Sequence, residues 1–74
     1  MSKQIDTIGM LCPMPLIKTK EELANMQSGQ ELTVNFDCIQ ATEAIPRFIA
    51  ENGHQVSNYE QIEDGVYTIT LKKK

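Results

Sequence analysis

The stretch GMLCPMPLIKTKEEL, residues 9–23, joins a short strand candidate to an amphipathic helix candidate. The strand candidate covers residues 5–8 and stops at the first glycine, and the helix candidate covers residues 13–26. Pro13 suits the first helical position, because the N–H that proline lacks would have no partner there. Gly29 suits the left-handed position that follows a helix. The apolar residues of the helix form one stripe with i, i+1, i+7, i+8 spacing: Leu16, Ile17, Leu23 and Ala24.

Downstream of this helix, apolar and polar residues alternate strictly across residues 31–37. This alternation predicts a strand with one buried face. A second helix is expected over residues 42–52, and Gly53 ends it. Pro46 indicates that this helix starts late, because proline is tolerated only in the first helical turn.

Two further strand candidates complete the chain. Residues 55–61 form the weaker one and residues 66–71 the stronger one, with a hairpin signal at residues 63–65 between them. The expected order is therefore β-α-β-α-β-β. Single apolar faces on all six elements predict a two-layer α/β sandwich, in which two helices cover one face of a four-stranded mixed sheet. We expect residues 1–74 to form a single domain.

Composition and charge exclude several classes of function. The chain of 74 residues has a net charge of −3, which lacks the basic excess of a nucleic-acid-binding protein. The basic run at residues 72–74 is interpreted as a solvated tail. The polar start of the sequence has no signal-peptide pattern, and no apolar run approaches the roughly 18 residues that would insert across a membrane. We therefore expect a cytoplasmic protein whose two cysteines are thiols. The wide spacing of its cysteines and single histidine argues against a metal site, and nothing indicates a cofactor.

Cys12 precedes the first helix directly, so we expect it to be the N-cap residue. A helix N-terminus favours an anion, and for a thiol this raises the thiolate fraction. Pro13 and Pro15 have no N–H, so they reduce the number of amides that a thiolate can accept from. They also fix the backbone and present the thiol rigidly. A buried cysteine that merely precedes a helix remains the alternative from position alone.

The segment CPMPLIKTKEEL resembles the Cys-Pro-x-Pro signature of the TusA/SirA-like sulfur-carrier family. The likeness continues through GQELTV, DC…AIPRFIAENGH and GVYTITLKK, and covers essentially the whole chain. The resemblance implies the sandwich fold described above. It also implies that Cys12 accepts a sulfane sulfur as a persulfide, with Pro13 and Pro15 as the structural part of the motif. The segment FDCIQATEAIP is similar to the YeeD branch, whose members are linked with YeeE-type thiosulfate transporters.

Three other residues are candidates for a role in this chemistry. Lys20 points into the apolar stripe of the first helix, so it either extends past its neighbours to solvent or attracts an anionic sulfur donor. Lys18 is a candidate contact for an anion or a partner. Cys38 follows the second strand, where it is a resolving thiol, a second sulfur acceptor or a small apolar filler. Its spacing to Cys12 matches neither a CxxC redox motif nor a zinc site.

Three functions remain open at this point. The first is a sulfur carrier that performs sulfurtransferase-type half-reactions on Cys12. Its donor is thiosulfate, a desulfurase or a rhodanese, and its acceptor is another protein. The second is an accessory module of a membrane thiosulfate transporter. The third is a thiol-redox switch that uses Cys12 and Cys38, which a reducing cytoplasm disfavours.

Overall fold

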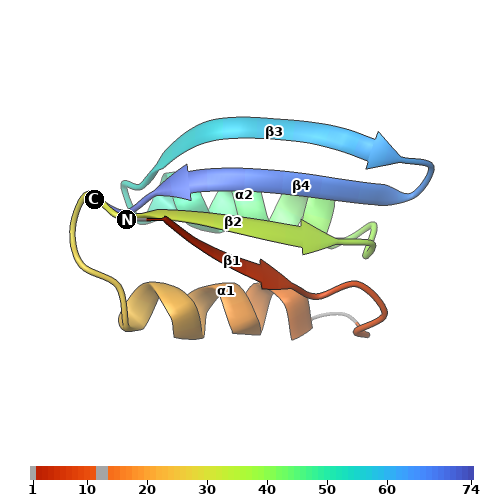
Figure 1. The fold of residues 1–74 in the computed structure, drawn as a ribbon, viewed down its shortest axis with the longest axis horizontal. Helices are drawn as coiled ribbons and strands as arrows, with labels where there is room; N and C mark the ends of the chain where they lie inside the picture. Colours follow the sequence, from red (N-terminus) through yellow and green to blue (C-terminus); the bar gives the residue numbers. More distant parts are fainter. Residues whose placement is uncertain (1, 12–13) are drawn as a thin grey trace.

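A computed structural model describes residues 2–11 and 14–74 of the chain. In these residues the elements follow in the order β1 (Ser2–Asp6), α1 (Met14–Ala24), β2 (Glu31–Phe36), α2 (Ala41–Glu51), β3 (Gln55–Glu63) and β4 (Val66–Lys72). The strands form one sheet in the order β1-β2-β4-β3 (Figure 1). β1 runs parallel to β2, whereas β4 is antiparallel to both β2 and β3. This mixed sheet and the order of the elements confirm the predicted fold.

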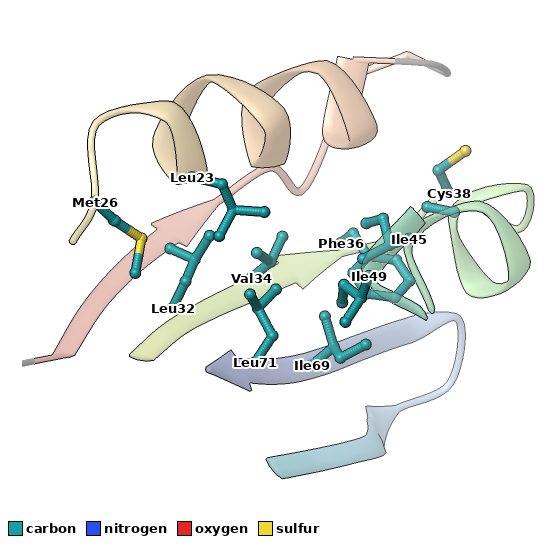
Figure 2. Packing of buried hydrophobic residues seen from close by; sticks show 11 residues of the cluster. Leu23, Met26, Leu32, Val34, Phe36, Cys38, Ile45, Ile49, Ile69 and Leu71 are labelled. Carbon is teal, nitrogen blue, oxygen red and sulfur yellow. The ribbon is translucent and has the colours of Figure 1, made fainter. Parts of the chain in front are cut away.

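The hydrophobic core lies between the sheet and the two helices. Alternate residues of β2 are fully buried, as the sequence pattern predicted, and Val34 pairs with Ile69 of β4. Both helices pack on this same face, because Leu23 of α1 and Ile45 of α2 belong to one cluster with the sheet residues (Figure 2). Each fully buried aliphatic side chain of this kind contributes about 1.5–3 kcal/mol.

The first strand begins and ends earlier than residues 5–8. β1 spans Ser2–Asp6, and its register places Ile5 opposite Val34 of β2. The carboxylate of Asp6 accepts the N–H of Ile8 at 3.0 Å, which turns the chain away from the sheet. The predicted strand was therefore shifted toward the C-terminus, because the apolar Ile8 belongs to the turn.

The buried face of α1 also differs from the predicted stripe. Pro15, Thr19 and Leu23 are buried at i, i+4, i+8 spacing, whereas Ile17 is 40% exposed and Ala24 is exposed. A threonine can take a core position here because its hydroxyl donates to the carbonyl oxygen of Pro15 at 2.8 Å. A pattern of apolar residues cannot reveal a polar side chain that is satisfied by its own helix.

The C-terminal end of α1 is capped by a distant residue. The helix ends at Ala24, before the predicted stop, and Gly29 lies in the later turn that precedes β2, with a φ of 88°. The ammonium of Lys73 donates to the carbonyl oxygens of Leu23 at 2.5 Å and Met26 at 2.6 Å. A cation at this position satisfies the last carbonyls and the negative end of the helix dipole. The interpretation of this lysine as part of a solvated tail was therefore wrong.

The second helix does not start late, although it contains a proline. α2 begins at Ala41, and Pro46 lies inside it. An uninterrupted helix would bond the N–H of residue 46 to the carbonyl oxygen of Thr42. Pro46 has no N–H, and the hydroxyl of Tyr59 on β3 donates to that oxygen instead, at 2.8 Å. The expectation from proline placement failed because a neighbouring strand satisfies the orphan carbonyl.

The end of α2 and the last hairpin agree with the sequence. Gly53 has a φ of 77°, and its N–H and that of His54 donate to the carbonyl oxygens of Ala50 and Ile49. This is the Schellman arrangement that a glycine after a helix predicts. β3 and β4 are joined by a turn at residues 64–65, and β3 extends two residues beyond the predicted end, to Glu63.

Candidate functional site

Two loops meet at one end of the sheet, at the carboxyl ends of β1 and β2, because these two strands are parallel. The carboxyl ends of parallel strands lie on the same side, so the segments after Asp6 and after Phe36 are neighbours (Figure 1). Both helices begin at this end of the sheet, since each follows one of the two loops. The residues between β1 and α1 therefore lie beside the connection from β2 to α2.

Hydrogen bonds fasten the first of these loops to β2 and to the second loop. The hydroxyl and N–H of the buried Thr7 both donate to the carbonyl oxygen of Asn35, at 2.7 and 2.8 Å. The N–H of Gly9 donates to the carboxylate of Asp37 at 3.1 Å. These contacts hold the chain leading to the Cys-Pro-x-Pro segment in a defined position.

Cys12 and Pro13 lie outside the described residues, so the N-cap assignment of Cys12 stays a prediction. Their neighbours on both sides are exposed: Leu11 is 82% exposed and Met14 is 37% exposed. Pro15 is the other proline of the motif and was also predicted to belong to the site. It lies in the first turn of α1 and is buried. The motif segment therefore combines a core-packed proline with solvent-facing apolar neighbours.

The first turn of α1 offers few amide donors to an anion. The N–H of Met14 donates to the carbonyl oxygen of Leu11 at 2.8 Å, and Pro15 has no N–H. The N–H of Leu16 is the next along the helix. Stabilisation of an anion at this position would therefore depend on the helix dipole more than on a nest of amides.

Cys38 lies next to the contact between the two loops. It directly follows Asp37, which accepts the N–H of Gly9, and it is 6% exposed at the margin of the core. Figure 2 shows its sulfur directed away from the aliphatic side chains of the cluster. The backbone thus brings the region of Cys38 to the loop that leads to Cys12.

The two candidate lysines of α1 contact other side chains. The ammonium of Lys20 lies over the ring of Phe48 on α2, 5.2 Å from its centroid, in a cation–π contact. Lys18 forms an exposed ion pair with Glu21, with 3.7 Å between Nζ and Oε1. Exposed pairs of this kind contribute little to stability, so Lys18 can exchange this partner at small cost.

Large apolar residues are exposed around the two loops. We name the following set the apolar rim: Ile8, Met10, Leu11, Met14 and Ile39. Ile39 belongs to the connection after β2 and is 80% exposed. Met26 is buried in the core and lies outside this set. The sequence analysis missed Ile39, whose signal was a lone aliphatic residue between Cys38 and the second helix.

The turn between α2 and β3 lies at the opposite end of the molecule from the loops that follow β1 and β2 (Figure 1). It contains His54, which contacts the C-terminal residues. The N–H of Lys74 donates to its Nδ1 at 3.0 Å, so Nδ1 is unprotonated. Burial, followed by the charges of Lys73 and Lys74, lowers the pKa of His54 below its usual value. Because the unfolded chain regains the usual pKa near 6.5, it binds this proton more readily. The contribution of neutral His54 to stability is therefore present above that pH and is lost as the pH falls toward the lowered pKa.

Comparison with known proteins decides the family. The family described as "Sulfurtransferase TusA" matches residues 3–73. The chain belongs to the TusA family. It is 51% identical to the "Putative sulfur carrier protein TsuB" of Escherichia coli over 96% of this chain and 95% of that protein. It is 39% identical to a protein of similar description from Methanocaldococcus jannaschii, over 96% and 93% of the two chains. The crystal structure of a SirA-like protein from Desulfitobacterium hafniense aligns with a TM-score of 0.84 and 28% identity, over 95% of each chain.

Membership of the TusA family identifies the chain as a sulfur carrier in the broad sense, a class of protein that interacts with sulfur donors and acceptors. No helix within residues 2–11 and 14–74 is long and apolar enough to cross a membrane. In the same described part of the chain, no three histidine, cysteine or acidic side chains are grouped as metal ligands.

Proposed function

We propose that this TusA-family protein carries sulfane sulfur as a persulfide on Cys12, takes it from thiosulfate and delivers it to an acceptor protein. The observations that support the proposal are the described surroundings of the Cys-Pro-x-Pro segment. In the sequence the segment leads from β1 to α1, a hydrogen bond joins the loops after β1 and β2, and an apolar rim is exposed around these loops. A cytoplasmic setting would keep the cysteine reduced between transfers.

The loading step is a displacement at sulfur. The thiolate of Cys12 attacks the outer sulfur of thiosulfate, the sulfur–sulfur bond of thiosulfate breaks, and sulfite leaves with the bonding electron pair. The product is the persulfide anion Cys-S-S⁻, and charge is balanced because a dianion enters and a dianion leaves. The positive end of the α1 dipole favours both the thiolate and the persulfide. Lys18 and Lys20, on the first turns of this helix, are the candidate contacts for the anionic donor.

The delivery step needs close approach by a second protein. A nucleophile of the acceptor attacks the outer sulfur of the persulfide, and the Cys12 thiolate leaves. The apolar rim supplies a water-excluding surface for this encounter, and the two methionines in it can adapt to partners of different shape. A desulfurase or a rhodanese would approach the same edge as a protein donor.

A second candidate function is that of an accessory module to a membrane thiosulfate transporter. The segment FDCIQATEAIP, which resembles the YeeD branch, forms the end of β2 and the start of α2 and contributes Ile39 to the apolar rim. In this role Cys12 would consume thiosulfate as it enters. Loss of thiosulfate-dependent growth after deletion of the gene, restored by the parent chain and not by Ile39→Ser, would favour it.

Intact-protein mass spectrometry after incubation with thiosulfate tests the carrier proposal. The parent and Cys38→Ser should both gain the mass of one sulfur atom, and Cys12→Ser should gain none. Equal loading of Cys12→Ser would contradict the assignment of Cys12. Loss of loading in Cys38→Ser would make Cys38 a participant. If mild oxidation removes two hydrogen masses from the parent and from neither variant, the Cys12/Cys38 redox switch is favoured instead.

A further inference from the structure

The hydrogen-bond ladder between β1 and β2 continues beyond the ends of both strands. The N–H of Thr7, the residue after β1, donates to the carbonyl oxygen of Asn35 at 2.8 Å. In a parallel pair such bonds recur at every second residue, so the next would join the N–H of Gly9 to the backbone carbonyl of Asp37. The N–H of Gly9 donates to the carboxylate of Asp37 instead, at 3.1 Å. This side chain therefore extends the ladder by one hydrogen bond after β1 and β2 have ended.

The backbone on both sides of this hydrogen bond suits it. Phe36 and Cys38, which flank Asp37, are 0% and 6% exposed and belong to the core, so the backbone of Asp37 is held on both sides. Asp37 continues the alternation of β2, and its half-buried side chain points away from the core. Gly9 has a φ of 87°, and a Cβ there would meet no atom within 4 Å. The backbone conformation, and not crowding, therefore accounts for this glycine.

The bond to Asp37 differs from the other hydrogen bonds of the loop. The N–H of Ile8 donates to the carboxylate of Asp6 at 3.0 Å, and the N–H of Met10 donates to the carbonyl oxygen of Thr7 at 3.1 Å. Both of these bonds lie within the turn that follows β1. The bond from Gly9 instead reaches a residue 28 positions away in the sequence. It joins the loop that leads to Cys12 to the connection between β2 and α2.

We propose that Asp37 is a positioning residue for sulfur loading, which acts through the N–H of Gly9 on the loop that leads to Cys12. This inference rests on the proposed function, because its effect is measured as the rate at which Cys12 gains sulfur. Asp37 need not touch the donor. A loop that is already fixed loses less freedom when the thiolate and the donor reach their reacting geometry, so loading is faster.

The charge of Asp37 and its hydrogen bond have opposite effects on loading. The carboxylate repels the thiosulfate dianion, so removal of the charge alone should not slow the reaction. Removal of the acceptor should slow it, because Gly9 is released. Asp37→Asn and Asp37→Ala separate the two effects. Both remove the charge, but only asparagine retains an oxygen that can accept the N–H of Gly9.

The test is the rate of loading with thiosulfate, followed by intact-protein mass spectrometry. Asp37→Ala should gain sulfur about fivefold more slowly than Asp37→Asn, because one hydrogen bond is lost. Asp37→Asn should load within about twofold of the parent rate. Asp64→Asn and Asp64→Ala are the matched controls, since Asp64 is exposed in the turn between β3 and β4. These two variants should load at equal rates.

Exchange of the Gly9 amide with water, measured by NMR, reports the contact without any sulfur. It should be about fivefold faster in Asp37→Ala than in Asp37→Asn, whereas the amide of Ile8, which bonds to Asp6, should be unchanged. Equal loading of the two Asp37 variants, from a parent that loads, would overturn the positioning role and leave the carrier function intact. Equal exchange of Gly9 in both variants would overturn it too. A parent that gains no sulfur would contradict the carrier function itself, and the positioning role with it.

Discussion

The hydroxyl of Tyr59 supplies a hydrogen bond that α2 cannot form within itself. Pro46 leaves the carbonyl oxygen of Thr42 without its helical donor, and Tyr59 donates to this oxygen from β3 at 2.8 Å. Tyr59→Phe removes the hydroxyl and retains the ring, which lies 6.4 Å from the ring of Phe36. The substitution therefore isolates one hydrogen bond between a strand and an interrupted helix.

The expected loss of unfolding free energy is about 0.5–1 kcal/mol. A typical hydrogen bond contributes about 0.5–1.5 kcal/mol, and the low end applies because Tyr59 is 40% exposed and water can reach the carbonyl. For a domain of this size, that loss corresponds to a decrease in Tm of about 2–8 °C. Urea denaturation followed by circular dichroism measures it.

A double-mutant cycle with Pro46→Ala identifies the cause. The alanine that this substitution introduces has an N–H that can donate to Thr42 within the helix, so the hydroxyl of Tyr59 is no longer needed. Tyr59→Phe should then cost less than about 0.5 kcal/mol in the Pro46→Ala background. The coupling between Tyr59 and Pro46 is expected because both act on the carbonyl oxygen of Thr42, which is 17 residues from Tyr59 in the sequence.

Tyr67→Phe is the matched control. Tyr67 also packs on Phe36, with 5.7 Å between the ring centroids, but it lies on β4 and does not bond to Thr42. Its cost should be the same in the parent and in the Pro46→Ala background. If the cost of Tyr59→Phe is equally independent of the residue at position 46, the assignment of Tyr59 as the substitute donor is refuted.

Two further predictions concern the C-terminal residues. Lys73→Met should lower the unfolding free energy by about 1–2 kcal/mol, because it removes charged hydrogen bonds to the end of α1. The exposed Lys72→Met should change it by less than about 0.5 kcal/mol, and equal effects would contradict the capping role. The parent should lose stability relative to His54→Gln as the pH falls from about 7.5 to about 5.5, since folding lowers the pKa of His54. Parallel pH profiles in urea denaturation would show that this histidine is not linked to folding.

The sequence predicted the elements whose signals are local. Alternation along residues 31–37 was sufficient for β2, because each inward residue must be apolar when one face is buried. Gly53 was sufficient for the end of α2, because the left-handed conformation favours glycine. The Cys-Pro-x-Pro segment, together with the downstream segments that share the family resemblance, pointed to Cys12, because such motifs consist of residue types at fixed spacing in the sequence.

Prediction failed where the spacing of apolar residues in the sequence does not indicate whether a residue is buried or exposed. Thr19 was missed as a core residue because its hydroxyl bonds inside its own helix. Ile39 was missed because an isolated aliphatic residue carries no periodicity, and its exposure beside the candidate site depends on the parallel pairing of β1 with β2.

The sequence by itself determined the order of strands and helices, the family, and the cysteine on which the proposed chemistry depends. The tertiary structure decided which groups satisfy the ends and interruptions of the helices. Lys73 reaches α1 across 50 residues and Tyr59 reaches α2 across 17. These partners follow from sheet register: the pairing of β4 with β2 places Lys73 beside the end of α1, and the pairing of β3 with β4 places Tyr59 beside α2. Local secondary-structure propensity contains no information about contacts between residues so far apart in the sequence. Tertiary packing determines these contacts.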